Sequence, residues 1–163
     1  KTVNEIVKAA SEMSRAKTGA LIVIEQNVRL DEYERTGIVI DSVLTSQILI
    51  NIFEHNTPLH DGAVIVRGNR ITAATCYLPL SDNMLLSKEL GTRHRAGVGI
   101  SEVTDSLTVI VSEETGAISV AYKGELMRKL TAEELKKLLV MAQNKTAAQK
   151  KFRLWKGWNK NEI

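Results

Sequence analysis

A glycine–asparagine pair between two apolar runs limits the possible folds of this chain more than any other feature. The pair is Gly68-Asn69, and the flanking runs, residues 63–66 and 71–78, are rich in β-branched and other apolar side chains. Glycine and asparagine tolerate the left-handed backbone of a tight hairpin turn, so the two runs are expected to pair antiparallel. A wholly parallel sheet is therefore excluded.

The rest of the sequence alternates short β-type runs with segments of helical periodicity. We expect further strands at residues 20–24, 37–43, 107–111 and 117–122, the last two joined as a second hairpin. Helices are expected at residues 3–13 and 44–53, with a short helical turn at 31–35 and a last helix after the Thr131/Glu134 capping-box pattern. The sequence therefore predicts the α/β class, a single domain with a central mixed β-sheet flanked by helices.

Length, composition and charge are those of one ordinary globular domain, with 163 residues, 44% of them hydrophobic and 25% charged. The formal net charge of +3 is too small to indicate a nucleic-acid partner, and no nucleic acid is predicted. Residues 144–163 form a basic C-terminal tail that also holds Trp155 and Trp158. Binding of this tail to a membrane surface or partner, packing onto the domain, and disorder are all open interpretations.

A dense basic cluster is the first candidate for chemistry, and it reads Gly91-Thr92-Arg93-His94-Arg95. Guanidinium groups form bidentate hydrogen bonds with phosphate oxygens, so this cluster suits a phosphate chain. Thr92 is expected to cap a helix that begins near Arg93, which would leave backbone amides free for an anion. The alternative is that the two arginines are surface cations paired with Glu89 and Glu102.

Carboxylates at strand ends are the second candidate. Asp61, followed by Gly62, opens the run at 63–66, where it suits a divalent cation or a hydroxyl that must lose a proton. Glu113 and Glu114 follow Ser112 at the end of the run 107–111 and could complete an oxygen-ligand site. A local turn for Asp61 and solvated hairpin carboxylates for the other two are the alternatives.

Tyr77 and Leu78, at the end of the run 71–78, are candidates for an adenine pocket in which the tyrosine stacks on a purine. A tyrosine that simply packs at a strand end is the alternative. Gly97 lies inside the helix expected after the basic cluster, and glycine costs about 1 kcal/mol in a helix interior. We therefore expect a looser helix at this point.

These motifs resemble those of a known family. The stretch Thr57-Pro58-Leu59-His60-Asp61-Gly62-Ala63, followed by the cluster at 91–95 and by residues 112–114, resembles the diadenylate cyclase domain, most closely its membrane-anchored bacterial type. The likeness runs from about Ala10 to Tyr122. It implies that residues 1–143 form a catalytic domain that condenses two ATP into cyclic di-AMP and two pyrophosphates, with Mn²⁺ or Mg²⁺ as cofactor.

The resemblance also implies residue roles and partners. The implied catalytic residues are Asp61, Arg93, His94 and Arg95, and the implied metal ligands are Asp61 and Glu114. ATP would be bound by Gly62, Ala63, Tyr77, Leu78, Gly91, Thr92, Arg93, His94, Arg95, Ser112 and Glu113. Catalysis would need a homodimer with two facing sites, and a regulatory protein could silence the enzyme by blocking that dimer.

The resemblance places the full-length protein at the cytoplasmic face of the bacterial membrane. No run of about 20 apolar residues is present, and the chain begins at Lys1, so we expect a soluble fragment whose membrane anchor lies outside this sequence. Two other functions are left open: a module that senses adenine nucleotides without turnover, and a membrane-surface interaction domain that works through the basic tail.

Overall fold

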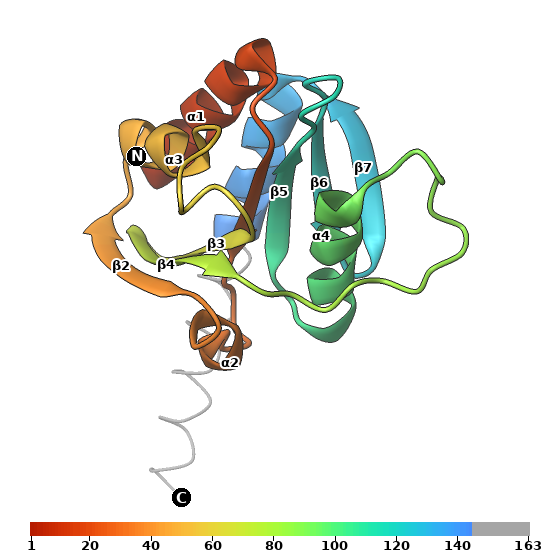
Figure 1. Ribbon diagram of the computed structural model, residues 1–163, viewed down its shortest axis with the longest axis horizontal. Coiled ribbons are helices and arrows are strands. Elements are labelled where there is room, and N and C mark those ends of the chain that lie inside the picture. Colours follow the sequence, from red (N-terminus) through yellow and green to blue (C-terminus); the bar gives the residue numbers. More distant parts are fainter. Residues whose placement is uncertain (145–163) are drawn as a thin grey trace, which may run out of the picture.

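The computed structural model describes residues 1–144, so the predicted basic tail lies outside the described part except for its first residue. The elements follow in the order α1 (Thr2–Ala16), β1 (Ala20–Ile24), α2 (Asp31–Glu34), β2 (Ile38–Val43), α3 (Ser46–Phe53), β3 (Ala63–Arg67), β4 (Arg70–Cys76), α4 (Thr92–Val103), β5 (Leu107–Val111), β6 (Ile118–Tyr122) and β7 (Glu125–Leu130). Residues 132–144 add a last helix, drawn in blue in Figure 1. Within residues 1–144, no helix combines the length and apolar character that a bilayer crossing requires.

The described strands form one seven-stranded sheet in the order β2-β4-β3-β1-β5-β6-β7, with β1 at its centre (Figure 1). β1 pairs parallel with β3, where Ile22 lies opposite Val64, and antiparallel with β5, where Ala20 lies opposite Val111. The other neighbouring strands pair antiparallel. The predicted mixed sheet is confirmed, and its parallel pair arises because α2, β2 and α3 separate β1 from β3 in the chain.

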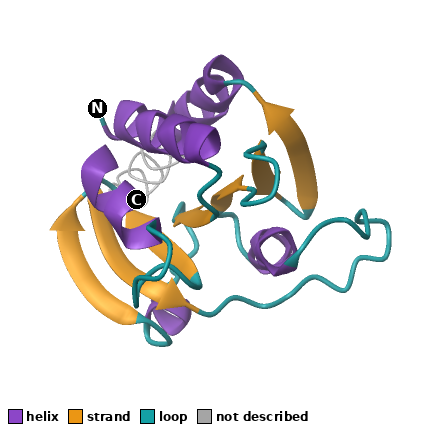
Figure 2. Ribbon diagram, turned by 45° about the horizontal axis from the view of Figure 1, so that its top comes forward, coloured by secondary structure: helices purple, strands orange, loops and turns teal. Residues whose placement is uncertain are grey.

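Both faces of the sheet are covered by helices, as Figure 2 shows. Side chains alternate along β1, so Ile22 belongs to one core cluster and its neighbours Leu21 and Val23 belong to the other. The first cluster takes in α1, α3 and the last helix, and the second takes in α4. The central strands β1, β3 and β5 are therefore buried along almost their whole length.

Both predicted hairpins are present. Residues 68 and 69 form the turn between β3 and β4, with Gly68 at a φ of 60°. β5 and β6 pair antiparallel, as expected from the second hairpin signal. The capping box is also confirmed, because Thr131 Oγ1 accepts a hydrogen bond from the Glu134 amide and Glu134 Oε1 accepts one from the Thr131 amide, each at 3.1 Å.

Strand β7 was not predicted. Its exposed Glu125, Arg128 and Lys129 obscure the alternation of apolar and polar residues that marks a half-buried strand. The available signal was the preceding Lys123-Gly124 pair, whose φ values of 50° and 78° form a tight turn between β6 and β7. This omission matters for the site, because Arg128 reaches the cavity described below.

Candidate active site

A cavity of about 690 Å³, here called the main cavity, gathers residues from distant parts of the chain. Its lining includes these predicted site residues: Asp61, Gly62, Tyr77, Leu78, Gly91, Thr92, Arg93, His94, Ser112, Glu113 and Glu114. Ala63 and Arg95 do not line it: Ala63 is fully buried in β3, and Arg95 is half-buried on α4. The fold therefore brings together the three motifs on which the predicted site depends, while the roles of all these residues stay predictions.

The basic cluster forms the first turn of α4. Thr92 is the first helical residue and Gly91 is the N-cap, so the prediction that Thr92 caps this helix is wrong by one position. Gly91 has the extended backbone of an N-cap residue, with φ −84° and ψ −167°, and makes no side-chain cap. The first intrahelical bond runs from the Arg95 amide to the Gly91 carbonyl at 3.2 Å, which leaves the preceding amides unpaired within the helix, as an anion site requires.

Two glycines of α4 allow this helix to pack closely against the rest of the protein. A Cβ on Gly97 would lie 2.6 Å from Ile110 Cδ1, and a Cβ on Gly99 would lie 1.8 Å from the Pro79 carbonyl oxygen. Both glycines are buried in a continuous helix. The expectation of a looser helix at Gly97 is therefore wrong: the missing side chains permit close packing, which holds the basic cluster in a fixed position on the sheet.

The Arg93 guanidinium group lies between a glycine and a carboxylate. Its Nη1 lies 3.3 Å from Glu113 Oε2, and a Cβ on Gly19 would come within 2.5 Å of the same Nη1. Arg93 Nε is buried without a hydrogen-bond partner in the described part of the chain. Within residues 1–144 neither arginine of the cluster pairs with Glu89 or Glu102, so the structure does not support the surface-cation alternative.

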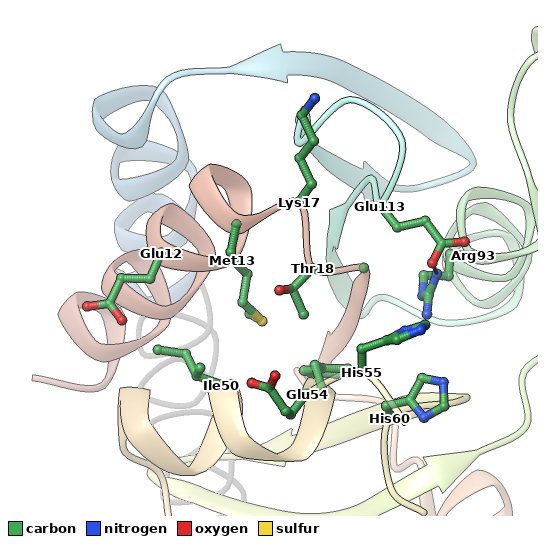
Figure 3. A pocket seen from close by; sticks show the side chains of 13 residues that line it. Glu12, Met13, Lys17, Thr18, Ile50, Glu54, His55, His60, Arg93 and Glu113 are labelled. Atoms are coloured by element: carbon green, nitrogen blue, oxygen red, sulfur yellow. Dashed lines mark ion pairs between the residues drawn. The ribbon is translucent and has the colours of Figure 1, made fainter. Parts of the chain in front are cut away.

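Arg93 also borders a second cavity of about 490 Å³, here called the side cavity (Figure 3). The two cavities share three lining residues, His60, Arg93 and Glu113. Figure 3 shows Arg93 and Glu113 directed toward each other, with the His55 and His60 side chains beside Arg93. The imidazole rings are 5.8 Å apart between centroids. The guanidinium group of Arg93 thus lies at the boundary of both cavities.

His94 is the buried member of the cluster, with 8% of its surface exposed. Burial lowers the pKa of His94, and the nearby positive charges of Arg128 and Arg93 lower this pKa further, whereas the negative charge of Glu114 opposes the shift. His94 is therefore neutral at neutral pH. A neutral imidazole can donate one hydrogen bond and accept one.

Asp61 is exposed in the loop that leads into β3. Its Oδ1 accepts a hydrogen bond from the Gly62 amide at 3.1 Å, so the local-turn interaction is real. Gly62 has a φ of 84°, and a Cβ there would lie 2.9 Å from the Thr75 carbonyl carbon, which makes glycine necessary. Within residues 1–144 the Asp61 carboxylate has no ion-pair partner, and it remains available to a substrate or cation.

Two carboxylates of the main cavity are candidate ligands for a divalent metal. Asp61 and Glu114 both line the main cavity, but no three His, Cys, Asp or Glu side chains of the described residues form a group that could hold a metal alone. Mg²⁺ sites in nucleotide enzymes commonly use one or two carboxylates and complete the coordination with substrate phosphates and water. Two carboxylates on one cavity fit such a site, which a nucleotide would complete.

Part of the lining comes from the end of β4 and the connection that follows it. Tyr77 is 75% exposed and Leu80 is 54% exposed, and both lie on the connection between β4 and α4. The Tyr77 amide donates a hydrogen bond to Thr36 Oγ1 at 2.8 Å, which fixes the backbone at the start of this connection. Burial raises the pKa of the Cys76 thiol to about 12, so this cysteine is not a nucleophile.

Arg128 and Gly19 are the residues that sequence reasoning missed. Arg128 lines the main cavity from β7, a strand that was not predicted. Gly19 directly precedes β1, and a Cβ there would lie 2.5 Å from Arg93 Nη1, so this glycine lies against the guanidinium group. A contact between positions so far apart in the chain has no signal in a single sequence.

The fold and site match a known family. Residues 7–126 match the DisA bacterial checkpoint controller nucleotide-binding family, also called DAC, and this chain belongs to that family. It is 58% identical over 139 residues to the cyclic di-AMP synthase CdaA of Bacillus subtilis, an alignment that covers 85% of this chain and 51% of the relative. It is 52% identical over 157 residues to a diadenylate cyclase of Listeria monocytogenes, covering 95% of this chain and 58% of the relative.

Solved structures give the same result. A double mutant of DacA from Staphylococcus aureus superposes with a TM-score of 0.86 at 51% identity, covering 87% of this chain and 95% of that chain. A protein from Bacillus cereus, described as a hypothetical membrane spanning protein, gives a TM-score of 0.78 at 43% identity over 80% of this chain and 64% of that chain. The chain thus has the fold of DacA, and it spans 51% and 58% of the lengths of the two curated relatives.

Proposed function

We propose that this chain carries the catalytic domain of a diadenylate cyclase, which condenses two ATP into cyclic di-AMP and two pyrophosphates. The observation that carries the proposal is the convergence of Asp61, Arg93 and Glu114 on one cavity, although they lie on three separate segments. Two relatives that are 52–58% identical to this chain are named cyclic di-AMP synthase and diadenylate cyclase, which supports the same activity. Phosphoryl transfer requires positioning and charge neutralisation more than covalent catalysis, which these residue types supply.

The proposed nucleotide orientation follows from the two kinds of lining. Tyr77 and Leu78 would bind the adenine, with the exposed tyrosine ring available for stacking. The phosphates would lie on the first turn of α4, where Thr92, Arg93, His94 and Arg95 offer amides and cations, and Ser112 would contact them from the other side. Gly62 and Ala63 would bring backbone close to the ribose, and Glu113 would hold Arg93 in place through the ion pair at 3.3 Å.

Asp61 would act on the ribose 3′-hydroxyl. Its carboxylate would accept the proton of this hydroxyl as the oxygen attacks the α-phosphate of the other ATP. The bond from the α-phosphorus to the oxygen bridging to the β-phosphate would break and pyrophosphate would leave, while Arg93 and Arg95 would stabilise the charge that develops. Bound at Asp61 and Glu114, a divalent cation, Mn²⁺ or Mg²⁺, would supply further neutralisation of the phosphate charge. His94, neutral at pH 7, would donate a hydrogen bond to a phosphate oxygen without adding charge.

A homodimer follows from the product. Each ATP of the pair supplies one attacking hydroxyl and one α-phosphate, so two identical sites must face each other across a two-fold axis. A monomer, which has one such cavity, should bind ATP but form no cyclic di-AMP. A regulatory protein that covered the face of the main cavity would block the reaction without altering any site residue.

The proposal extends to the organisation of the longer protein. Residues 1–143 would form the catalytic domain, and residues 144–163 a basic tail. The full-length protein would lie at the cytoplasmic face of the bacterial membrane, held by a segment outside this chain. Support comes from the two curated relatives, of which the alignments cover 51% and 58%, and from the structural neighbour described as membrane spanning.

Incubation with ATP and either Mn²⁺ or Mg²⁺, with products separated by chromatography and identified by mass, tests the proposal. Cyclic di-AMP and pyrophosphate in a 1:2 ratio are expected. Bound but unconsumed ATP with both metals, at protein concentrations high enough for dimerisation, would instead indicate a nucleotide sensor. A chain that binds no ATP would contradict both functions.

A further inference from the structure

Strand β7 brings a guanidinium group to the main cavity that the motifs do not include. Arg128 lines this cavity, whereas its neighbour Lys129 does not. β7 is held in place by antiparallel pairing with β6, where Met127 lies opposite Val120. Arg128 follows Met127 at a shift of the register, beyond which Leu130 lies opposite Ile118, and a β-bulge of this kind can direct a side chain toward a site.

The charge of Arg128 is unpaired in the described part of the chain. Arg93, the other guanidinium of the lining, forms an ion pair with Glu113, but within residues 1–144 no carboxylate comes into ion-pair range of Arg128. The Arg128 side chain is also exposed. An anion that enters the cavity can therefore bind this group without displacing a protein carboxylate.

Arg128 lies on the part of the cavity that carries the other charged groups. Its positive charge acts on buried His94 together with that of Arg93, and the negative charge of Glu114 acts on the same imidazole. Arg128 and His94 also line the same cavity, so Arg128 lies near the basic cluster. Tyr77 and Leu78 do not take part in this charged group.

The charge balance of the cavity lining favours a second arginine for binding a triphosphate. The lining holds two guanidinium groups, Arg93 and Arg128, against four carboxylates, Asp61, Glu89, Glu113 and Glu114. ATP brings several more negative charges in its triphosphate. Without Arg128, Arg93 would be the one guanidinium group left in the described lining of the main cavity, and Arg93 already forms an ion pair with Glu113.

We propose that Arg128 binds the phosphate chain of the nucleotide in the main cavity, together with the first turn of α4. This assignment rests on the proposed function and adds to it a residue outside the recognised motifs. Arginine suits the role because its planar fork forms paired, charge-assisted hydrogen bonds with phosphate oxygens.

Calorimetric titration of the 163-residue chain with α,β-methylene-ATP and with adenosine tests the assignment. Arg128→Gln should weaken binding of the ATP analogue about tenfold, or about 1.4 kcal/mol, and leave adenosine binding within about twofold. Arg128→Lys should recover part of the lost affinity for the ATP analogue, because lysine keeps the positive charge but cannot form the paired hydrogen bonds of a guanidinium group. Lys129→Gln is the matched control, because it removes the same charge from the adjacent, exposed residue of the same strand.

The outcomes separate this assignment from the proposed function. If the unaltered chain binds the analogue and makes cyclic di-AMP, while R128Q binds like K129Q, only the Arg128 assignment is overturned. Equal loss of ATP analogue and adenosine in R128Q would indicate a structural role and would also overturn it. An unaltered chain that does not bind the analogue would overturn the assignment and the proposed function together.

Discussion

The two sides of the main cavity differ in how firmly the protein holds them. The helix wall, residues 91–94 and 96, is backed by buried residues from Ala96 to Ser101. Gly97 and Gly99 bring α4 into contact with β5 and Pro79. The loop wall, residues 60–62 and 112–115, is half-buried or exposed. Its Asp61 and Glu114 carboxylates make no ion pair in the described part of the chain.

This difference corresponds to two tasks. A phosphate-binding surface works best when its donors are positioned before the substrate arrives, because no reorganisation is then needed. Carboxylates that bind a cation or accept a proton must instead stay free until the nucleotide is present. The packed helix wall suits the first task, and the exposed loop wall suits the second.

The largest expected effect is on the chemistry of the loop wall. Asp61→Asn removes the proposed proton acceptor and should lower cyclic di-AMP formation by at least about 100-fold, while ATP affinity changes little. Product assay and calorimetry measure the two quantities. Asp82→Asn is the control, since Asp82 is exposed and lies outside the cavity lining. Unchanged turnover in D61N would refute the role assigned to Asp61.

The helix wall should respond through stability. Gly99→Ala places a methyl group 1.8 Å from the Pro79 carbonyl oxygen and should lower the free energy of unfolding by about 3 kcal/mol. Gly91→Ala, whose Cβ meets no atom within 4 Å, should cost less than about 1 kcal/mol, mainly from a poorer N-cap. Urea denaturation compares the two. Similar losses would show that α4 is not tightly packed at Gly99.

A smaller effect is expected where the two walls meet at Arg93. Gly19→Ala should displace the guanidinium from its position near Glu113 and weaken ATP binding about tenfold, or about 1.4 kcal/mol, without altering adenosine binding. In an Arg93→Ala background the same substitution should have no further effect, because the displaced group is absent. An undiminished effect of Gly19→Ala in that background would contradict the positioning role.

The smallest effect concerns the pH dependence of His94. Its pKa is lowered in the folded state below the ordinary value of 6.5, so the unfolded chain binds more protons as the pH falls past 6.5. The stability contributed by neutral His94 is therefore complete above pH 6.5 and is lost as the pH falls through its folded pKa. The slope is at most about 1.4 kcal/mol per pH unit.

His94→Gln should flatten this part of the stability curve. The measurement is the free energy of unfolding of both proteins by urea between about pH 5 and 7, a range in which carboxylates stay mostly ionised. His55 and His60 remain in both proteins and cancel in the comparison. Parallel curves would mean that burial of His94 does not affect its protonation.

Local patterns explain which parts of the fold were predictable. The hairpin at Gly68-Asn69 and the capping box at Thr131 each lie within a few residues, and both are present. The turn at Lys123-Gly124 was equally local but was not used, and β7 was missed with it. The N-cap of α4 was misplaced by one residue because threonine is a common N-cap and glycine gives a weaker signal.

The site was predictable to the extent that its motifs were contiguous. Arg93 and Asp61 were found from their neighbours in sequence and both line the main cavity. The contact of Gly19 with Arg93 and the approach of Arg128 depend on how separate strands are placed by the sheet order. Such contacts follow from tertiary packing, which one sequence does not encode in any short pattern.

The most direct test of the account is the rate of cyclic di-AMP formation per protein molecule as the concentration of the 163-residue chain is raised at saturating ATP with Mn²⁺. Two facing sites predict that this specific rate rises with protein concentration until the dimer is fully formed, and that D61N stays inactive throughout. Cyclic di-AMP formation at a constant specific rate down to concentrations where the chain is monomeric would contradict the facing-site mechanism. Absence of product at every concentration, with ATP still bound, would contradict the proposed cyclase activity.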